Sequence, residues 1–568
     1  MAPSTTSHPS PLRGTRDRAR GTRLALMAVG LTLSLAAVAC GTSAKSDSST
    51  ATTVVPGGKD ATQDEGTPKD GGALAIGISA ETNGWNPANA QWADTGSLVG
   101  STVLEPLATQ GADSGAKPWL ADSWIANEAF DQWQIKLHPG IKYQSGEDFD
   151  AASVKQNIDA YVHGPLSGIA LAPMFKQVSV IDPLTVQVEL NQPWAAFPSS
   201  FLQGGSSYMM SPTMLASSDK GASHPIGTGP FIFDSWEPGN NFKVKKNPNY
   251  WVKGLPHLDS IEFKVIPDDS TRADTVQAGD VNMMYTTRAL DATKLAATET
   301  VVKDWSTEDV FVMPNTAPQV GGKFNPLSNI HARKALALAT DTSAVAAGVG
   351  DGVEVPTSPW SPKNVWGMPD NQNGYVSFNL EGAKSEVAQY LADTGQPSLK
   401  FTLAGLPGVD TQKTLQQVQS QWKDAGIEVN IETLEQTAYI TKIATGDYQA
   451  AFFRNYGYPD PDQDYYFWSA STAKGVGTIS INFTQYTTPQ MESDLTTGRT
   501  SGYANIRKTA YDDLAKQLNA GFTNIWLYRT PYSIIADPKV MGFAKAKAVG
   551  FGNFQPKTWW GDLWRATN

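Results

Sequence analysis

The chain contains a single cysteine, Cys40, among its 568 residues. With no second cysteine there is no intramolecular disulfide, and the body after Cys40 has no thiolate zinc site and no cysteine nucleophile. Histidine is also scarce, with six residues, and no two histidines after Cys40 have metal-ligand spacing. These absences argue against a metalloenzyme, and we expect no cofactor.

Charge is also sparse, and it is mainly negative. Charged residues make up 17% of the chain, and 44 Lys and Arg against 55 Asp and Glu give a net charge of −11. An acidic chain with no basic cluster in its body does not have the positive surface that nucleic-acid binding requires, so we expect no nucleic-acid partner. The length is enough for roughly three or four compact units.

Long apolar runs are absent except near the N-terminus. The run Leu24 to Ala39 is uncharged and follows a segment that holds five arginines, Arg13 to Arg23. It is shorter than the roughly 20 residues of a membrane-spanning helix and fits the hydrophobic region of an export signal. The sequence therefore predicts a signal peptide over residues 1–39 and an exported body.

Cys40 stands at the end of this apolar run. The segment Leu35 to Gly41 resembles a bacterial lipobox, whose cysteine is lipidated and becomes the first residue of the mature chain, although Ala37 stands where Leu is commonest. Ordinary cleavage nearby is the alternative. Residues 41–71 are rich in Ser, Thr, Gly and Asp and poor in apolar residues, as in a flexible tether. We expect a lipid anchor at Cys40, a tether to residue 71 and a location on the extracytoplasmic face of the membrane.

The clearest regular pattern runs from Leu399 to Arg454. Alternating apolar residues predict strands over 399–404, 427–431 and 448–453. Between them, the spacing predicts one helix from an N-cap at Asp410 to a terminating Gly426, and a second over 438–445. This β-α-β-α-β order predicts an α/β lobe with a parallel sheet. Ligands bind beyond the carboxyl ends of such strands, so the loop from Arg454 to Asp464 is a candidate binding site.

Other segments predict shorter strands and one further helix. Alternation predicts strands over 74–79, 133–137, 184–190, 242–245 and 261–266. A helix over 151–161 with Asp148 as its cap is also predicted.

Several segments in order resemble the family 5 solute-binding proteins of ABC transporters, which include peptide, nickel and oligosaccharide receptors. Each motif alone is weak, but together they extend over residues 72–545. The matching runs include Glu105–Ala108, Pro118–Trp124, Leu137–Tyr143, Asp148–Val154, Pro225–Phe231, Trp236–Gly239, Asn247–Trp251, Leu258–Ile261, Gln277–Asp280, Ala332–Ala339 and the pair Asp460-Pro461.

The resemblance implies a periplasmic-binding-protein-like type II (cluster C) fold, in which two α/β lobes enclose a ligand and an extra domain is inserted in the first lobe. By that likeness lobe I takes residues 72–106, 225–313 and 531–568, the inserted domain 107–224, and lobe II 314–530. It also implies a monomeric receptor that delivers its ligand to ABC permease and ATPase subunits.

Aromatic and acidic residues are concentrated in the candidate loop. Tyr456 and Tyr458 precede the Asp-Pro turn, and we expect them to face the cleft, since aromatic walls suit varied ligands. Asp460 and Asp462 either contact the ligand or cap a helix that starts near Gln463. From lobe I, the likeness and the strand-end rule predict that three residues face this loop: Asn83, Trp85 and Asn86.

Two positions bear on the ligand class. Peptide receptors of this family typically place an Asp three residues before the Asp-Pro pair to hold the ammonium group of the peptide, whereas this chain has Gly457. Three residues earlier it has Arg454, whose guanidinium suits a carboxylate or another anion. A peptide is our first expectation, Asp460 or Asp462 then taking the ammonium group. An oligosaccharide, a metal chelate or another anionic solute are the alternatives.

A secreted serine hydrolase is the competing class. Ser114 and Ser217 each begin a Ser-x-x-Lys match, but the chain has no Lys-Thr-Gly, no Ser-Asp-Asn and no Gly-x-Ser-x-Gly motif. We therefore expect a binding protein with no catalytic residues rather than an enzyme.

Overall fold

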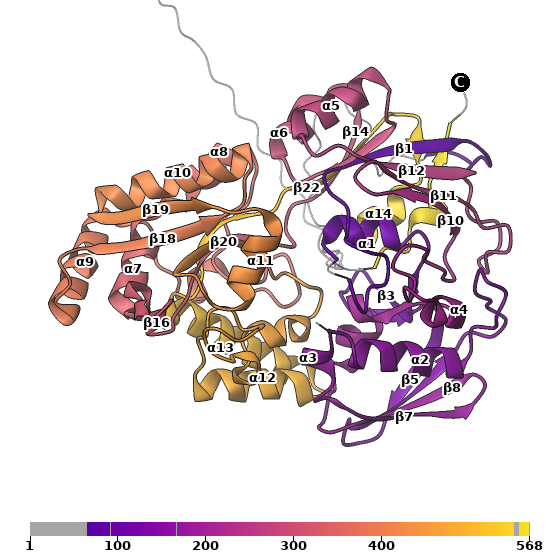
Figure 1. Ribbon diagram of the computed structural model, residues 1–568, viewed down its shortest axis with the longest axis horizontal. Coiled ribbons are helices and arrows are strands. Elements are labelled where there is room, and N and C mark those ends of the chain that lie inside the picture. Colours follow the sequence, from indigo (N-terminus) through magenta and orange to yellow (C-terminus); the bar gives the residue numbers. More distant parts are fainter. Residues whose placement is uncertain (1–64, 91, 166, 550–555, 567–568) are drawn as a thin grey trace, which may run out of the picture. The chain divides into compact units, whose positions relative to one another are not determined.

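Three β-sheets organise the chain in the computed structural model, which describes residues 65–90, 92–165, 167–549 and 556–566 (Figure 1). The predicted signal peptide, Cys40 and the tether up to residue 64 lie outside the described residues. Among the described helices, none is long and apolar enough to span a membrane.

Lobe I is built around a seven-stranded sheet. Its central strand β1 (Ala73–Ile78) pairs in parallel with β12 and β13, and the other pairings in the sheet are antiparallel. The order is β10 (Phe231–Glu237), β11 (Asn241–Lys246), β12 (Ser260–Val265), β1, β13 (Met283–Thr286), β22 (Tyr532–Ala536) and β14 (Thr300–Asp304). Its helices are α1 (Asp94–Gly100), α5 (Asp269–Ala278), α6 (Ala289–Leu295) and α14 (Ala544–Val549).

Lobe II contains the predicted β-α-β-α-β unit. Its sheet has the order β19 (Ile427–Thr433), β18 (Leu399–Gly405), β20 (Ala450–Asn455), β15 (Asp309–Pro314) and β21 (Ile525–Arg529). Strand β18 pairs in parallel with β19 and β20, which confirms the predicted parallel unit, whereas β15 pairs antiparallel with β20 and β21. Its helices are α7 (Ile330–Ala339), α8 (Thr342–Val349), α9 (Leu380–Thr394), α10 (Val409–Asp424), α11 (Gln436–Ala444), α12 (Pro489–Thr500) and α13 (Ala504–Gly521).

The inserted domain has an antiparallel four-stranded sheet. Its order is β5 (Ala121–Ala126), β6 (Gln132–Leu137), β8 (Thr185–Leu190) and β7 (Phe175–Asp182), and its helices are α2 (Ala151–Val162), α3 (Ser167–Leu171) and α4 (Pro212–Ala216). The alternation predicted for β8 buries Val186, Val188 and Leu190. Short pairs complete the strands: β2 (Glu105–Pro106) with β9 (Tyr208–Met209), β3 (Ala108–Gln110) with β4 (Ala116–Pro118), β16 (Gln319–Val320) with β17 (Lys323–Phe324), and β23 (Val540–Met541) with β24 (Trp564–Arg565).

The distribution of buried residues joins the inserted domain to lobe I. One hydrophobic cluster runs through both, from Leu74 and Ile76 in β1 to Ile135 and Val186 in the inserted sheet. Lobe II has two clusters of its own, which contact opposite sides of its sheet through Val312 and Phe311, neighbours in β15. Lobe I and the inserted domain therefore share a core, and lobe II is packed separately.

Two short segments connect lobe I with lobe II. The first crosses from β14 to β15 over residues 305–308, and the second returns from β21 to β22 over residues 530–531. The topology thus assigns β15 to lobe II, whereas the predicted lobe I segment extended to residue 313. We call these two segments the crossovers.

Two residues that were predicted to cap helices do not do so. Helix α2 is capped by Asp150, which accepts from the Ser153 amide while the Ser153 hydroxyl bonds back to Asp150, so the prediction of Asp148 is wrong by two residues. Helix α10 begins at Val409, so Asp410 lies in its first turn instead of capping it.

Candidate functional site

The site lies where the carboxyl end of β20 meets the crossovers. Arg454 is the next-to-last residue of β20 and is opposite Val310 in β15. Its Nε lies 3.0 Å from the Glu308 carboxylate in the first crossover, and its Nη2 lies 3.4 Å from Asp94, the first residue of α1. A lobe II side chain therefore contacts both lobe I and a crossover.

Glu308 holds this region together. It accepts hydrogen bonds from Tyr532 at 2.6 Å and from Thr530 at 3.0 Å, so it connects the first crossover with the second. Burial raises the pKa of Glu308, and the nearby Arg454 guanidinium partly offsets that rise. Because Arg454 is close to two carboxylates, its positive charge is already balanced by residues of the chain.

Arg454 is the accessible member of the group. Its side chain is 34% exposed, against 9% for Asp94 and 1% for Glu308. The Tyr532 ring lies 5.7 Å from its guanidinium carbon, and Tyr285 donates to Asp94 at 3.3 Å. We call Asp94, Glu308, Arg454 and Tyr532 the crossover cluster.

Tyr458 lies in the loop that follows β20 and is half-buried. Burial raises the pKa of Tyr458, and the neighbouring carboxyls of Asp464 and Glu308 raise it further. Of the predicted ligand residues, Arg454 is placed by its ion pairs, and Tyr458 lies four residues after it in the loop that follows β20.

Buried polar atoms without hydrogen-bond partners are also found near this position. They include Thr307 Oγ1, Glu308 Oε1 and both carboxylate oxygens of Asp464, as judged within the described residues. Burial raises the pKa of Asp464 well above its ordinary value, and the proximity of Asp309 adds to the rise. A buried polar group without a partner is costly to the folded state.

Tyr456 is in the core of lobe II. Its ring stacks on Phe311 at 5.1 Å and lies 5.0 Å from Trp468, and the residue is 3% exposed. This placement differs from the expected cleft-facing position, because the left-handed backbone at Tyr456 and Gly457 belongs to a turn that directs the ring inward. Burial also raises the pKa of Tyr456.

Asp460 and Asp462 have structural roles and do not contact the cleft. Asp460 caps the 3-10 helix Pro461–Phe467 and is paired with Arg507 at 2.6 Å. Asp462 is paired with Arg499 at 2.7 Å. Both carboxylates are buried and bonded within the protein, so neither is open to a ligand in this structure.

In lobe I, Asp94 at the start of α1, and none of the predicted residues, is the one paired with Arg454. Trp85 is in the lobe I core, against Phe242 and Trp236, and Asn86 is buried with its side chain bonded to the Lys220 carbonyl and the Ala88 amide. Both expectations of cleft-facing side chains are therefore corrected. Asn83 is exposed on the same loop. Asp94, a little farther along, makes the contact with Arg454.

Asp94 and Glu308 had no sequence signal of their own. Asp94 is separated from β1 by a loop that carries three more prominent candidates, and Glu308 acquires its role only because the chain crosses between lobes there. Asp464 was visible as part of an acidic run, but its burial was not.

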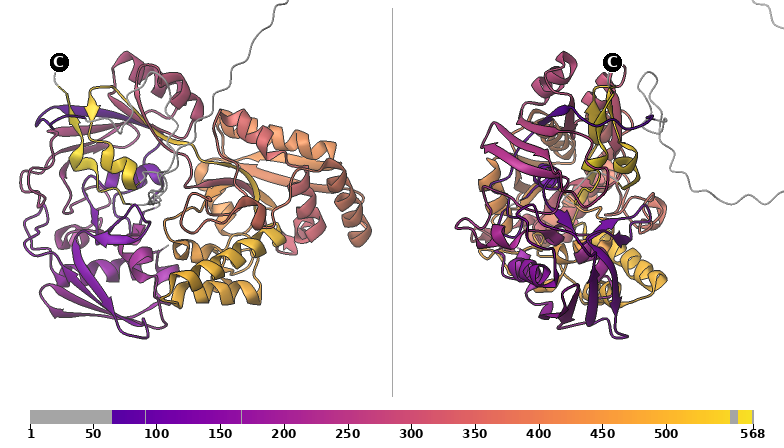
Figure 2. Two further views of the ribbon diagram at one scale, coloured as in Figure 1. Left: turned by 180° about the vertical axis from the view of Figure 1, so that it is seen from behind. Right: turned by 90° about the vertical axis from the view of Figure 1, so that its right-hand side faces the viewer.

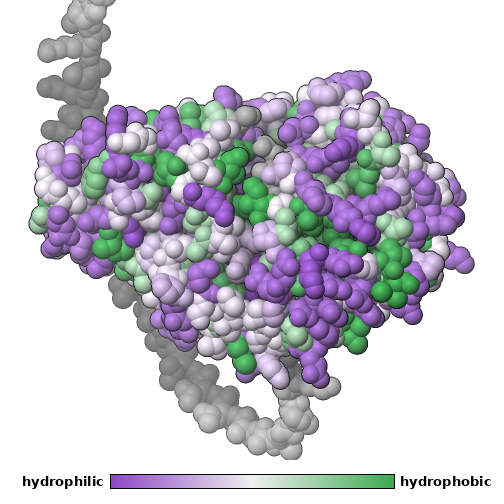
Figure 3. All heavy atoms as spheres, turned by 60° about the horizontal axis from the view of Figure 1, so that its bottom comes forward, coloured by the Kyte–Doolittle hydropathy of each residue, from purple (hydrophilic) through white to green (hydrophobic). Residues whose placement is uncertain are grey.

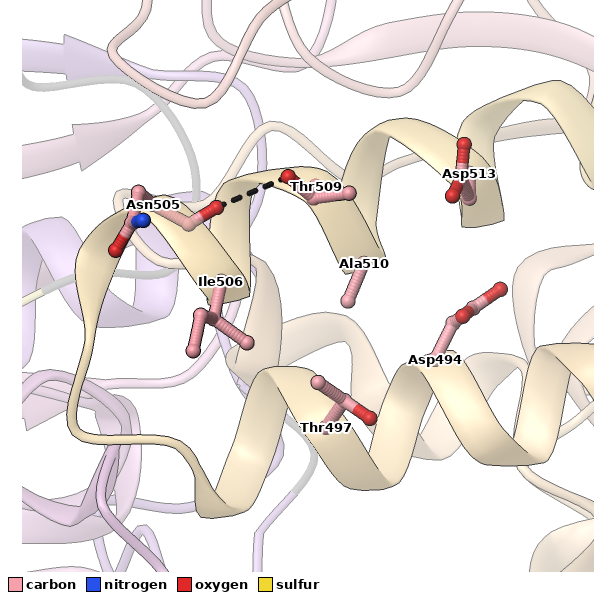
Figure 4. Close-up of a pocket in the computed structure, with 7 residues that line it drawn as sticks. All are labelled: Asp494, Thr497, Asn505, Ile506, Thr509, Ala510 and Asp513. Carbon is pink, nitrogen blue, oxygen red and sulfur yellow. Dashed lines mark hydrogen bonds between the residues drawn. The ribbon is translucent and has the colours of Figure 1, made fainter.

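Two surface grooves of the described residues lie away from the crossover cluster. One groove, of about 270 Å³, lies between α12 and α13. Figure 4 shows the residues that line it: Asp494, Thr497, Asn505, Ile506, Thr509, Ala510 and Asp513. A second, of about 680 Å³, lies along α10 and β19. The face in Figure 3 carries separate hydrophobic patches among hydrophilic residues. No predicted site residue lines either cavity.

Comparison with known proteins identifies the family. Residues 115–476 match the model of the bacterial extracellular solute-binding proteins, family 5. The chain belongs to this family. The family protein is the extracytoplasmic substrate-binding component of an ABC transporter, and it binds solutes without converting them, so this chain is not an enzyme.

Individual relatives support the assignment and the fold. A glutathione-binding protein of Pectobacterium atrosepticum is 26% identical over 451 residues, which cover 76% of this chain and 82% of the relative. The periplasmic binding protein DppA from Helicobacter pylori, solved with the peptide STSA, has a TM-score of 0.74 at 20% identity, covering 88% of this chain and 98% of that one.

A third likeness is to AgaA of A. tumefaciens R10, solved with agropinic acid. It has a TM-score of 0.74 at 23% identity, covering 88% of this chain and 99% of that one. The fold of these structures is the expected cluster C fold. Within the described residues, no group of three or more His, Cys, Asp or Glu side chains could hold a metal ion.

Proposed function

We propose that this family 5 binding protein captures a small peptide or peptide-like solute between its lobes and delivers it to a permease. The observation that carries the proposal is Arg454, which lies at the carboxyl edge of the lobe II sheet with a third of its side chain exposed. Relatives named for glutathione, a peptide and agropinic acid support a ligand with carboxylate groups.

The geometry supports a carboxylate of the ligand as the partner of Arg454. The Nε side of the guanidinium is held by Glu308 at 3.0 Å, whereas the Nη2 contact with Asp94 is longer, at 3.4 Å. A ligand carboxylate can take the Nη groups in a bidentate pair while Glu308 keeps the arginine in place. The carboxylates that already surround Arg454 favour a ligand that also carries a positive group, as a peptide does.

The ligand class is tested by a thermal-shift screen of glutathione, short peptides, oligosaccharides and metal chelates. Stabilisation by peptides supports the proposal, and stabilisation by sugars or chelates alone contradicts it. Small-angle scattering with the compound that binds should show compaction, because closure requires a ligand with higher affinity for the closed state.

The role of Arg454 is tested by calorimetry on Arg454→Ala with the same compound. We expect a loss of about 2–5 kcal/mol in binding free energy, since the charged partner of the ligand carboxylate is removed. Arg288→Ala is the matched control, because Arg288 also joins the lobes, through Asp410 at 3.0 Å, but is not in the crossover cluster. Unchanged affinity in Arg454→Ala, or an equal loss in both variants, would refute the role of Arg454 as an anchor.

A further inference from the structure

The inserted domain contacts lobe II through the two acids of the Asp-Pro turn. Trp194 donates its indole N–H to Asp462 at 2.6 Å, and Ser199 donates its hydroxyl to Asp460 at 2.6 Å. Figures 1 and 2 show α12 and α13 beside the inserted domain in this region. We call Trp194, Ser199, Asp460, Asp462, Arg499 and Arg507 the acid contact.

The two sides of the acid contact differ in charge. The acids and their arginines all belong to lobe II, where Arg499 pairs with Asp462 and Arg507 with Asp460. The inserted domain contributes neutral groups: the Trp194 and Ser199 side chains, the Ala196 amide, which donates to the Arg499 carbonyl at 3.2 Å, and the Met174 sulfur, 3.5 Å from Arg499 Nη1. When the two parts separate, no charge loses its partner, so the contact can form and break without the large penalty of an unpaired buried ion.

The donors are rigidly held on their own side. Trp194 is 2% exposed and packs edge-on against Phe197 at 5.4 Å, within the core that the inserted domain shares with lobe I. On the other side, the Arg499 guanidinium lies 3.5 Å from the centre of the Tyr465 ring and 4.9 Å from that of Trp194. Although burial alone would lower it, the adjacent Asp462 carboxylate keeps the pKa of Arg499 above its ordinary value.

The same arrangement connects the acid contact with the ligand site. The site needs Arg454 of lobe II near Asp94 of lobe I. Because lobe I and the inserted domain share one core, a contact that holds the inserted domain against lobe II also holds Asp94 near Arg454. In the joined arrangement the inserted domain lies against lobe II, and in the separated one it does not. A residue that stabilises the joined arrangement increases its population and therefore the affinity for the ligand.

We propose that Trp194 and Ser199 are positioning residues for ligand capture. They raise the share of ligand-free molecules in which the inserted domain lies against lobe II and the crossover cluster is assembled, and ligand binding raises that share further. They do not contact the ligand. Asp460 and Asp462 are then acceptors for this contact rather than partners for an ammonium group. This inference goes beyond the proposed function, since it applies whatever the ligand is.

The test uses two conservative variants, Trp194→Phe and Ser199→Ala, each of which removes one donor and leaves the Asp–Arg pairs intact. Two control variants lose a hydrogen bond from the same type of donor inside lobe II, to a neutral acceptor: Trp422→Phe, whose indole donates to Thr340 at 2.9 Å, and Ser328→Ala, whose hydroxyl donates to the Asn325 carbonyl at 2.7 Å. Small-angle scattering of the full ligand-free chain is the first measurement, and calorimetry with glutathione or a bound peptide is the second.

We expect a larger radius of gyration for Trp194→Phe and Ser199→Ala than for the parent chain and both controls. Each variant loses a hydrogen bond to a carboxylate that forms only in the joined arrangement. This arrangement is therefore destabilised, and the affinity for the ligand should fall about ten- to a hundredfold. Equal scattering of both variants and the parent overturns the inference. If no peptide binds the parent, the proposed function fails, but the ligand-free scattering still decides this inference.

Discussion

Gly457 shows how one residue fixes the loop that follows β20. Its φ is +76°, and a Cβ at this position would lie 1.1 Å from the Thr307 carbonyl oxygen in the first crossover. The backbone of the loop therefore lies directly on the crossover, and no side chain fits between them. This explains why the aspartate that the family resemblance places here is absent: an aspartate would force the loop away from Thr307.

We predict that Gly457→Ala lowers the free energy of unfolding by about 2–5 kcal/mol, the sum of a steric clash and a left-handed backbone. Gly395→Ala is the control, since Gly395 has a φ of +65° but open space around its Cβ, and it should cost about 1 kcal/mol. Urea unfolding of both variants measures the difference. Equal losses would show that Thr307 does not constrain the loop.

Lys557 gives the molecule a pH dependence at the residue scale. Its side chain is 3% exposed, and burial lowers its pKa to about 7, despite the nearby carboxylates of Asp304 and Asp94. Between that value and the ordinary pKa of 10.5, the unfolded chain binds a proton that the folded chain does not. The free energy of unfolding should therefore rise with pH, by at most about 1.4 kcal/mol per unit.

The measurement is urea unfolding between about pH 7.5 and 9, because this range lies above the ordinary pKa of histidine and below that of tyrosine. Lys557→Met should flatten the rise because it removes the titrating group. The same slope in both proteins would assign the pH dependence to other residues.

Helix α2 illustrates what the sequence pattern specifies at the scale of an element. Apolar periodicity located the helix, but its exact start depends on which side chain turns back to the first free amide. Asp150 does so, whereas Asp148 forms a surface pair with Lys142. We predict that Asp150→Ala costs about 1–2 kcal/mol and that Asp148→Ala has little effect.

Thermal or urea unfolding of these two variants distinguishes the caps. A larger loss for Asp148→Ala would restore the cap predicted from the sequence.

The order of helices and strands was predictable wherever the spacing of apolar residues followed a single period, that of a helix or that of a strand. Leu415, Val418 and Trp422 are buried on α10, Gly426 ends it with a φ of +82°, and the parallel strands lie on either side. The orientation of side chains in the loop after β20 was not predictable, because Tyr456 and Tyr458 are two residues apart in a turn that has no periodic pattern. The roles of Asp460 and Asp462 depend on Trp194 and Ser199, more than 250 residues away in sequence, and no local pattern reports such contacts.

At the scale of the whole molecule, the predicted lipid anchor lies outside the described residues and stays a prediction. We propose that Cys40 is lipidated and holds the body at the membrane surface. Cys40→Ser should release soluble protein or leave uncleaved precursor, measured by membrane fractionation and intact mass. A variant that still carries acyl chains and sediments with membranes unchanged would exclude Cys40 as the anchor.

The position of β22 in the lobe I sheet has a consequence for folding. Strand β14 pairs in that sheet only with β22, and β22 lies between β13 and β14 although it is made more than 200 residues later. Lobe II, in contrast, has every strand of its sheet within the continuous stretch 309–529 and can fold as a unit as soon as that stretch is available. The first part of the body to emerge during synthesis or export must therefore wait for Tyr532–Ala536 before its sheet is complete.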